Sequence, residues 1–224
     1  DIALNNPNNI IANWFWRTGE MPGALVCPLA GWIIFSYGEK TLNKLIGLAI
    51  ELGGSVYLGC YIADYFFIKD SFQTAFGAVF GIGIGVCLLF AGRFISLPKK
   101  LKKPLVTIAV AGIACMFVKT AVTEITKIFW GRERMRMLIA EGSYDNFTQW
   151  YLPQGITDSN EYKSFPSGHT SGAAMSYLAM LLSYAGGNFE RYNKLYFAVP
   201  FVYTSIVAFT RLVMGAHFLS DVTV

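Results

Sequence analysis

The chain has 224 residues, of which 54% are hydrophobic and only 14% are charged, and its mean hydropathy is +0.44. Soluble domains carry about a quarter charged residues, so this composition excludes an ordinary soluble domain and indicates a chain solvated by lipid. The net charge of +4 is small. We interpret it as loop charge that sets membrane orientation, and we expect no nucleic-acid partner.

The first element is residues 1–20, in which Trp14, Phe15, Trp16 and Arg17 stand together. Aromatic rings beside a cation are typical of a segment that lies in the membrane interface. The chain starts at Asp1 without a methionine and stops at Val224 inside an apolar run. We therefore expect both ends to be trimmed, with a helix missing before residue 1.

Seven apolar runs follow, each a candidate to cross a hydrocarbon core of about 30 Å. Their approximate ranges are 21–37, 43–67, 72–92, 105–129, 169–186, 195–210 and a last one that opens near residue 214 and is cut by the chain end. The sequence shows no internal repeat. We therefore predict an all-α fold, a polytopic transmembrane helix bundle that forms a single membrane domain over residues 1–224.

Loop charge predicts which ends of these helices face the same side. Residues 93–104 carry five Lys or Arg and no acid, so this loop should be cytoplasmic. Alternation then places residues 1–20, the long loop 131–165 and the turn at 211–217 on the outer side. The glycines of residues 77–85 lie in mid-membrane with no strand before them, so we interpret them as a close helix contact and not as a phosphate loop.

Ionisable side chains gather at the predicted outer ends of helices. His169 and His217 are the two histidines of the chain, and Lys127, Arg134 and Arg211 share their predicted face. Any one of these groups could simply reach from a helix end to water. Their convergence instead indicates a site for an anion, since ammonium and guanidinium groups suit phosphate oxygens.

The sequence around each histidine has a physical sense. In Pro166-Ser167-Gly168-His169, proline and serine suit a helix start, glycine permits close approach of a ligand, and the exposed N–H groups favour an anion. In the second block, His217 and Asp221 are four residues apart. On one helix they would share a face, so that the carboxylate could hold one imidazole nitrogen as N–H and leave the other free.

Three blocks together resemble the signature of the type 2 phosphatidic acid phosphatase superfamily, K-x6-RP, PSGH and SR-x5-H-x3-D. The chain has them in order as Lys127-IFWGRE-Arg134-Met135, Pro166-Ser167-Gly168-His169 and Thr210-Arg211-LVMGA-His217-FLS-Asp221. Two positions depart from the pattern. Met135 replaces a proline, which frees the backbone that places Arg134, and Thr210 replaces a serine but keeps a hydroxyl. The resemblance covers residues 127–221, which form the expected catalytic region.

The resemblance implies a membrane enzyme that hydrolyses a lipid phosphomonoester or pyrophosphate through a phosphohistidine. It assigns the catalytic roles to three residues: His217 as the nucleophile, Asp221 as the group that orients it, and His169 as the acid and base. Phosphate binding falls to five further residues: Lys127, Arg134, Ser167, Gly168 and Arg211. Fixed cations can stand in for Mg²⁺, and the sequence has neither a carboxylate cluster nor a thiolate site. We therefore expect no metal and no cofactor.

Nearby charges have more than one interpretation. Glu124 and Lys127 are three residues apart on one helix, so the acid could orient the ammonium. Arg132 and Arg136 flank Arg134, and they form either a solvated basic loop or a contact with an anionic headgroup.

The sequence is also compatible with functions other than lipid phosphate hydrolysis. A phosphotransferase would use the same intermediate, and a non-catalytic lipid-binding or transport protein would need neither histidine. A vanadate-dependent haloperoxidase shares the signature but is a soluble protein, unlike this chain. The partners expected are the bilayer and a lipid substrate: phosphatidic acid, phosphatidylglycerophosphate, undecaprenyl diphosphate or a lipid A phosphate. The predicted outer site favours a bacterial inner membrane with the site facing the periplasm or exterior, and the sequence does not indicate an oligomeric state.

Overall fold

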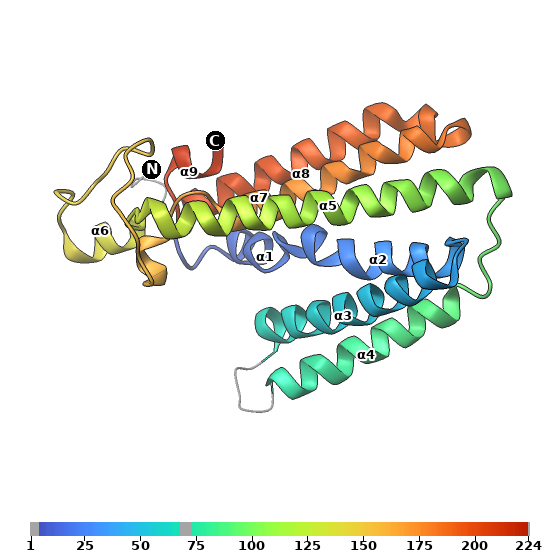
Figure 1. Ribbon diagram of the computed structural model, residues 1–224. Coiled ribbons are helices and arrows are strands. Elements are labelled where there is room, and N and C mark those ends of the chain that lie inside the picture. Colours follow the sequence, from blue (N-terminus) through green and yellow to red (C-terminus); the bar gives the residue numbers. More distant parts are fainter. Residues whose placement is uncertain (1–4, 68–72, 224) are drawn as a thin grey trace. The chain divides into compact units, whose positions relative to one another are not determined.

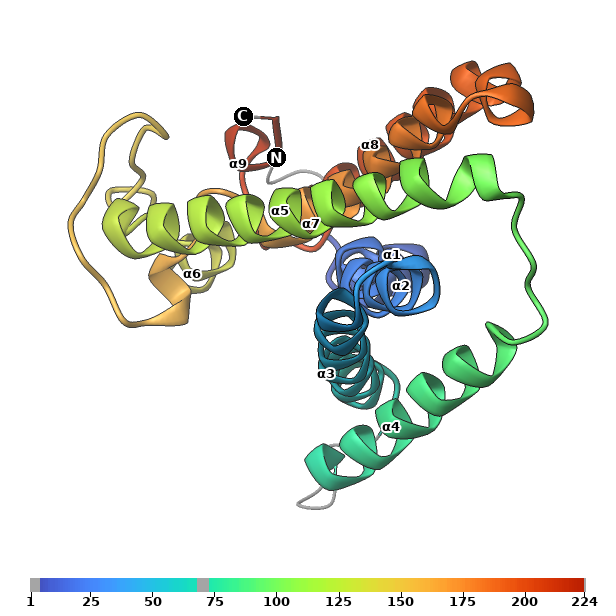
Figure 2. The same ribbon diagram turned by 45° about the vertical axis from the view of Figure 1, so that its right-hand side comes forward.

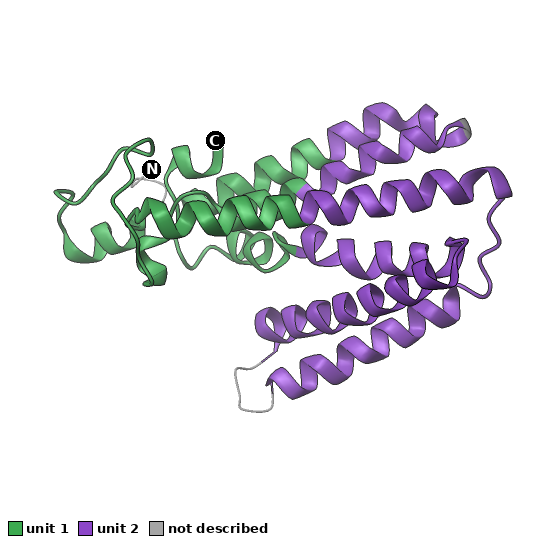
Figure 3. Cartoon of the chain, viewed as in Figure 1, with its two compact units in different colours: residues 1–20, 117–174, 200–224 green, residues 21–116, 175–199 purple. Residues whose placement is uncertain are grey.

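The computed structural model describes residues 5–67 and 73–223, and in these ranges every regular element is a helix (Figure 1). The all-helical prediction is confirmed. Residues 1–4 of the expected interfacial segment, residue 72 of the third expected span and Val224 lie outside the described residues. The chain forms two compact units: unit 1 holds residues 1–20, 117–174 and 200–224, and unit 2 holds residues 21–116 and 175–199 (Figure 3).

Five stretches of the described chain are long and apolar enough to cross a membrane: Ile10–Tyr37, Thr41–Phe66, Gln73–Ala91, Lys99–Glu141 and Asn188–Val213. The first contains α1 (Ile10–Thr18) and α2 (Met21–Tyr37). The next two are α3 (Thr41–Phe66) and α4 (Gln73–Ala91). The last two contain α5 (Lys99–Trp130) with α6 (Met135–Glu141), and α8 (Asn193–Val213). The chain is therefore a membrane protein with a helical bundle.

Two of the seven expected spans differ in the structure. The run 169–186 is helical but divided into α7 (Gly168–Ala174) and the 3₁₀ helix η3 (Met175–Ala185), and η4 (Gly187–Tyr192) follows it. The seventh expected span opens with α9 (Leu219–Thr223) and not near residue 214, because α8 ends at Val213 and a turn follows it. The long loop 131–165 is also less irregular than expected, since it contains α6 and the 3₁₀ helix η2 (Asn160–Tyr162).

Glycines set the contact between α3 and α4 in unit 2. A Cβ placed on Gly59 would lie 2.2 Å from the carbonyl oxygen of Gly77 and 2.4 Å from the backbone nitrogen of Gly81. The two backbones therefore touch, and no side chain larger than hydrogen fits between them. The interpretation of the glycines of residues 77–85 as close helix packing is confirmed for Gly77, Gly81 and Gly85, whereas a Cβ on Gly83 would meet nothing within 4 Å.

Replacing Gly59 with leucine is expected to lower the free energy of unfolding by at least about 1–3 kcal/mol, because the new side chain overlaps the α4 backbone. Thermal unfolding in detergent measures the effect. Gly83→Leu on α4 is the matched control, since a Cβ there meets nothing within 4 Å. Equal loss of stability in both variants would contradict this account of the α3–α4 contact.

Candidate active site

His217 lies in the turn between α8 and α9. A Schellman arrangement ends α8: the Ala216 nitrogen donates to the Arg211 oxygen at 3.1 Å, the Gly215 nitrogen donates to the Leu212 oxygen at 2.9 Å, and Gly215 has φ +63°. The chain therefore leaves the helix before residue 217. The prediction that His217 and Asp221 share a helix face is wrong, because His217 precedes α9.

The imidazole of His217 is held by a backbone carbonyl. Its side chain is 2% exposed, and Nδ1 lies 2.7 Å from the Ser164 oxygen. A carbonyl oxygen can only accept, so Nδ1 carries the proton and Nε2 keeps a lone pair in the neutral ring. Asp221 Oδ2 is 3.8 Å from Nδ1, which is too far for a hydrogen bond, so Asp221 acts on the ring as a nearby charge.

Asp221 itself is buried and ties several segments together. Its carboxylate accepts from Ser164 Oγ at 2.6 Å, from the Phe218 nitrogen at 2.9 Å, and from the guanidinium of Arg132. Its backbone oxygen accepts from the Ser167 nitrogen at 2.8 Å. Burial raises the pKa of Asp221, but the hydrogen bonds and cations around it outweigh burial and hold that pKa below its usual value. The carboxylate is therefore an anion that fixes Ser164 and Phe218, the residue after His217, while the backbone oxygen fixes Ser167 before His169.

Lys127 ends α5 next to the PSGH block. Its ammonium contacts Glu124 Oε1 at 2.8 Å, so the predicted pair on one helix face is confirmed. A Cβ placed on Gly168 would lie 2.9 Å from Lys127 Nζ. Gly168 therefore leaves the space that the ammonium occupies, and a larger residue there would displace it.

Arg134 is held by hydrogen bonds to the loop residues Asn160 and Glu161, although Met135 follows it where the family pattern has proline. It is the N-cap of α6, its nitrogen donates to the Glu161 oxygen at 2.9 Å, and its guanidinium donates to the oxygen and the side chain of Asn160 at 2.9 and 3.1 Å. Met135 is the first residue of α6 and is buried. Proline is favoured at the first position of a helix, which is the position that Met135 occupies in α6.

The remaining motif residues have local partners. Ser167 precedes α7, and its hydroxyl accepts from the Thr170 nitrogen at 3.3 Å, which confirms the predicted helix start. Arg211 is buried in the last turn of α8. The Thr210 hydroxyl donates to the Val207 oxygen at 2.7 Å and serves its own helix.

All eight predicted site residues belong to unit 1, and charged members of the set act on one another. The imidazole of His169 lies within electrostatic reach of Arg211, His217, Lys127 and Arg134. Within unit 1, α7 and the last turns of α8 lie beside α5 (Figure 1, Figure 2). These helices carry or adjoin both histidines, Lys127 and Arg211. Within residues 5–67 and 73–223, no group of three or more His, Cys, Asp or Glu side chains could hold a metal ion.

A model of the family described as the PAP2 superfamily matches residues 105–224, more than half of the chain. The chain belongs to the PAP2 superfamily. The match contains all three motif blocks, and it gives the chain the phosphatase-type chemistry of this superfamily, the hydrolysis of phosphoric esters. No curated protein and no solved structure matched the chain.

Arg132 is a residue of this PAP2 site that sequence reasoning missed. Its side chain is 2% exposed, donates to Asp221 and to Ser220 Oγ at 2.8 Å, and lies 4.4 Å from the ring centre of Phe218. Neither a solvated loop nor a headgroup contact describes it, so both interpretations are wrong for Arg132. The signal was weak, because three arginines alternate over residues 132–136 and local sequence does not show which one points inward.

Glu20 is the second missed residue of the PAP2 site. Its Oε1 lies 3.2 Å from Nδ1 of His169, so the carboxylate holds Nδ1 as N–H and leaves the lone pair of the neutral ring on Nε2. Gly172 permits this contact, since a Cβ on Gly172 would lie 3.0 Å from the Glu20 Cα. No motif marks Glu20, which follows α1 more than a hundred residues before the first motif block.

Replacing Glu20 with glutamine is expected to lower turnover about 100-fold, the usual contribution of a positioned acid or base. The reason is that His169 loses the charge that fixes its tautomer. The pH profile of turnover should change as well, which a purely structural role would not cause. Glu141→Gln, an exposed acid at the end of α6, should leave both unchanged. An unaltered pH profile in Glu20→Gln would contradict the role.

Titration of His217 gives a further prediction. Burial is the largest effect and lowers the pKa of His217 to about 4, and Arg211 and Arg134 add to this while Asp221 opposes it. Because the folded pKa lies below the ordinary value near 6.5, the neutral ring stabilises the fold fully above about pH 6.5, and this contribution is lost as pH falls toward 4. The thermal unfolding temperature should therefore fall more steeply between pH 7 and pH 4 for wild type than for His217→Asn. Parallel curves would contradict it.

Proposed function

We propose that the protein removes phosphate from a membrane lipid, a phosphomonoester or a pyrophosphate, through a phosphohistidine on His217 and without a metal ion. The observation that carries the proposal is the carbonyl of Ser164 at Nδ1 of a buried His217. It leaves Nε2 as a nucleophile in a site to which α5 and α8 each bring a fixed cation.

The first chemical step is attack by His217 Nε2 on phosphorus. The N–P bond forms as the bond to the lipid oxygen breaks, and His169 donates a proton to that oxygen. The positive charge on the phosphorylated ring faces the Asp221 carboxylate 3.8 Å from Nδ1. Lys127, Arg134 and Arg211 offset the charge on the nonbridging oxygens, which is the main requirement of phosphoryl transfer.

The second step reverses these roles. His169 takes a proton from water, the oxygen of that water attacks phosphorus, and the N–P bond breaks to release inorganic phosphate. Glu20 lies 3.2 Å from His169 Nδ1 and supports both steps. Its carboxylate stabilises the His169 imidazolium before that ring donates its proton to the lipid oxygen and after it accepts a proton from water. We further propose that the site opens at the outer face of a bacterial inner membrane, where a lipid enters with its phosphate toward the cations.

The test is phosphate release by purified protein in detergent with excess EDTA. The panel is phosphatidic acid, phosphatidylglycerophosphate, undecaprenyl diphosphate and lipid A, each beside a water-soluble phosphomonoester. We expect release from at least one lipid, faster than from the soluble ester, and the preferred lipid identifies the substrate. Release only after a divalent metal is added, or from the soluble ester alone, would contradict the proposal. Transfer of the phosphate to an added acceptor lipid, in place of its release, would show a phosphotransferase.

A further inference from the structure

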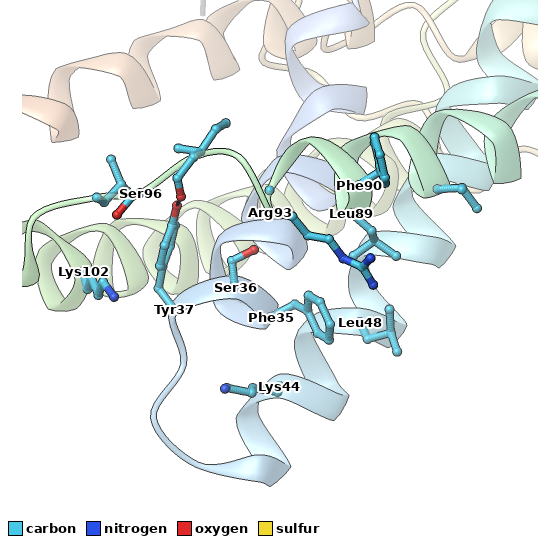
Figure 4. A pocket seen from close by; sticks show the side chains of 14 residues that line it. Phe35, Ser36, Tyr37, Lys44, Leu48, Leu89, Phe90, Arg93, Ser96 and Lys102 are labelled. Atoms are coloured by element: carbon cyan, nitrogen blue, oxygen red, sulfur yellow. Dashed lines mark hydrogen bonds between the residues drawn. The ribbon is translucent and has the colours of Figure 1, made fainter.

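Unit 2 contains a cavity of about 770 Å³ that the proposed function does not use. It lies where α2 ends, α3 begins, α4 ends and α5 begins (Figure 4). Three cations line it, Lys44 from α3, Arg93 from the segment after α4, and Lys102 from the first turn of α5. None of the described residues that line it is acidic, so the cavity has a positive potential that no wall neutralises.

The other part of the wall is hydrocarbon. Phe35, Leu48, Leu89 and Phe90 line the same space, and in Figure 4 the Arg93 side chain points toward Phe35 and Leu48. A ligand that fills this cavity therefore needs an anionic group and an apolar chain in one molecule. A small hydrated anion would leave the apolar wall uncovered, and an uncharged lipid would leave three cations unmatched.

Tyr37 lines the cavity, and the buried indole nitrogen of Trp32 lies behind its wall. The ring of Tyr37 faces Lys102 Nζ at 5.7 Å from its centre, and its hydroxyl donates to the Ile95 oxygen at 3.1 Å, so it holds the loop and the lysine together. The indole nitrogen of Trp32 has no hydrogen-bond partner among the described residues. It adjoins Gly92, which lines the cavity, since a Cβ there would lie 2.5 Å from that nitrogen.

Membrane orientation alone does not account for this arrangement. Excess Lys and Arg in a cytoplasmic loop needs no cavity and no particular positions. Lys100, Arg191 and Lys194 would serve orientation equally well, yet none of them lines the cavity. The cations that do line it come from three separate segments and meet over an apolar wall.

We propose that this cavity binds an anionic phospholipid of the surrounding membrane, with its phosphodiester headgroup against Lys44, Arg93 and Lys102. One acyl chain lies along Leu48, Leu89 and Phe90. Basic pockets between membrane helices suit such headgroups. The inference does not rest on the proposed function, because the cavity adjoins the first turn of α5 whereas Lys127 lies in the last turn of that helix.

The test measures lipid binding and not activity. Purified His217→Asn protein, which cannot turn over lipid by the proposed mechanism, is titrated in detergent with phosphatidylglycerol or phosphatidylcholine of matched chains, and native mass spectrometry counts the bound molecules. We expect phosphatidylglycerol to bind about tenfold more tightly or better. The triple variant Lys44→Gln, Arg93→Gln, Lys102→Gln should lose this preference. The control Lys100→Gln, Arg191→Gln, Lys194→Gln removes the same charge and should keep it.

A second variant guards against misfolding of the first. Ser96 is exposed and lines the cavity, so Ser96→Glu should repel the lipid phosphate while Ser96→Gln should bind as wild type does. Three results would overturn the proposal: equal binding of the two lipids, equal loss of binding in both triple variants, or displacement of phosphatidylglycerol by millimolar inorganic phosphate. The last would show a site for a free anion.

Discussion

Replacing His217 with alanine is expected to lower the rate of phosphate release by a factor of about 10⁴ or more, as removal of a nucleophile that acts together with its partners does. The imidazole is 2% exposed and tied to Ser164 at 2.7 Å, so no other side chain can take its place at that point of the site. Initial rates with the preferred lipid measure the loss.

A second substitution at the same position separates chemistry from folding. Asparagine can place an N–H close to the position of Nδ1 and can therefore keep the hydrogen bond to the Ser164 carbonyl, but it has no counterpart of Nε2. His217→Asn should unfold at nearly the wild-type temperature in neutral solution and still be inactive. Activity within tenfold of wild type in either variant would contradict the nucleophilic role of His217.

Replacing Arg132 with glutamine is expected to lower the free energy of unfolding by about 3–5 kcal/mol, because it leaves the Asp221 carboxylate buried without its counter-ion. Asp221 is fully buried and anchors both Ser164 and the nitrogen of Phe218. His217 precedes Phe218 and contacts the Ser164 oxygen, so its position depends on that carboxylate and activity should fall as well. Thermal and denaturant unfolding in detergent measure the stability, and phosphate release measures the activity.

Arg136 is the matched control for Arg132. Both are arginines beside Arg134, and Arg136 also forms an ion pair, with Glu161 Oε1 at 2.5 Å, but its side chain is 44% exposed. An exposed pair contributes about 0–1 kcal/mol. Arg136→Gln should therefore have a small effect on stability. Similar losses in the two variants would mean that burial of the Arg132–Asp221 pair is not what matters.

Apolar runs predicted most of the helices, and motif spacing selected residues that the structure places in one unit. The runs at 21–37 and 195–210 fall on α2 and α8. The three motif blocks fall in unit 1, as their shared chemistry requires. The length of an apolar run reports whether a segment can cross the lipid, so it finds long helices well. It does not report where a helix ends inside an apolar run, and for that reason the seventh span was expected near residue 214 and begins at Leu219.

The details that differ depend on contacts between distant residues. Gly215 ends α8 with a positive φ, and the hydrogen bond from His217 to the Ser164 oxygen joins residues 53 apart. Glu20 and His169 are farther apart still, and a lone acid in an aromatic interfacial segment carries no motif. The burial of Arg132 depends on Phe218 and Asp221. Local sequence shows which residue types are present, and the fold decides which of them meet.

Trapping of the phosphoenzyme tests the central claim most directly. Wild-type and His169→Ala proteins are each mixed with the preferred lipid carrying ³²P, quenched in base within one turnover and separated from free lipid, because the loss of His169 should slow both formation and hydrolysis of the intermediate. The account predicts radioactivity that stays on the protein in base, is lost in acid, maps to the peptide containing His217, and is absent from the double variant His169→Ala, His217→Asn. Label that maps elsewhere, or that persists in the double variant, would contradict it.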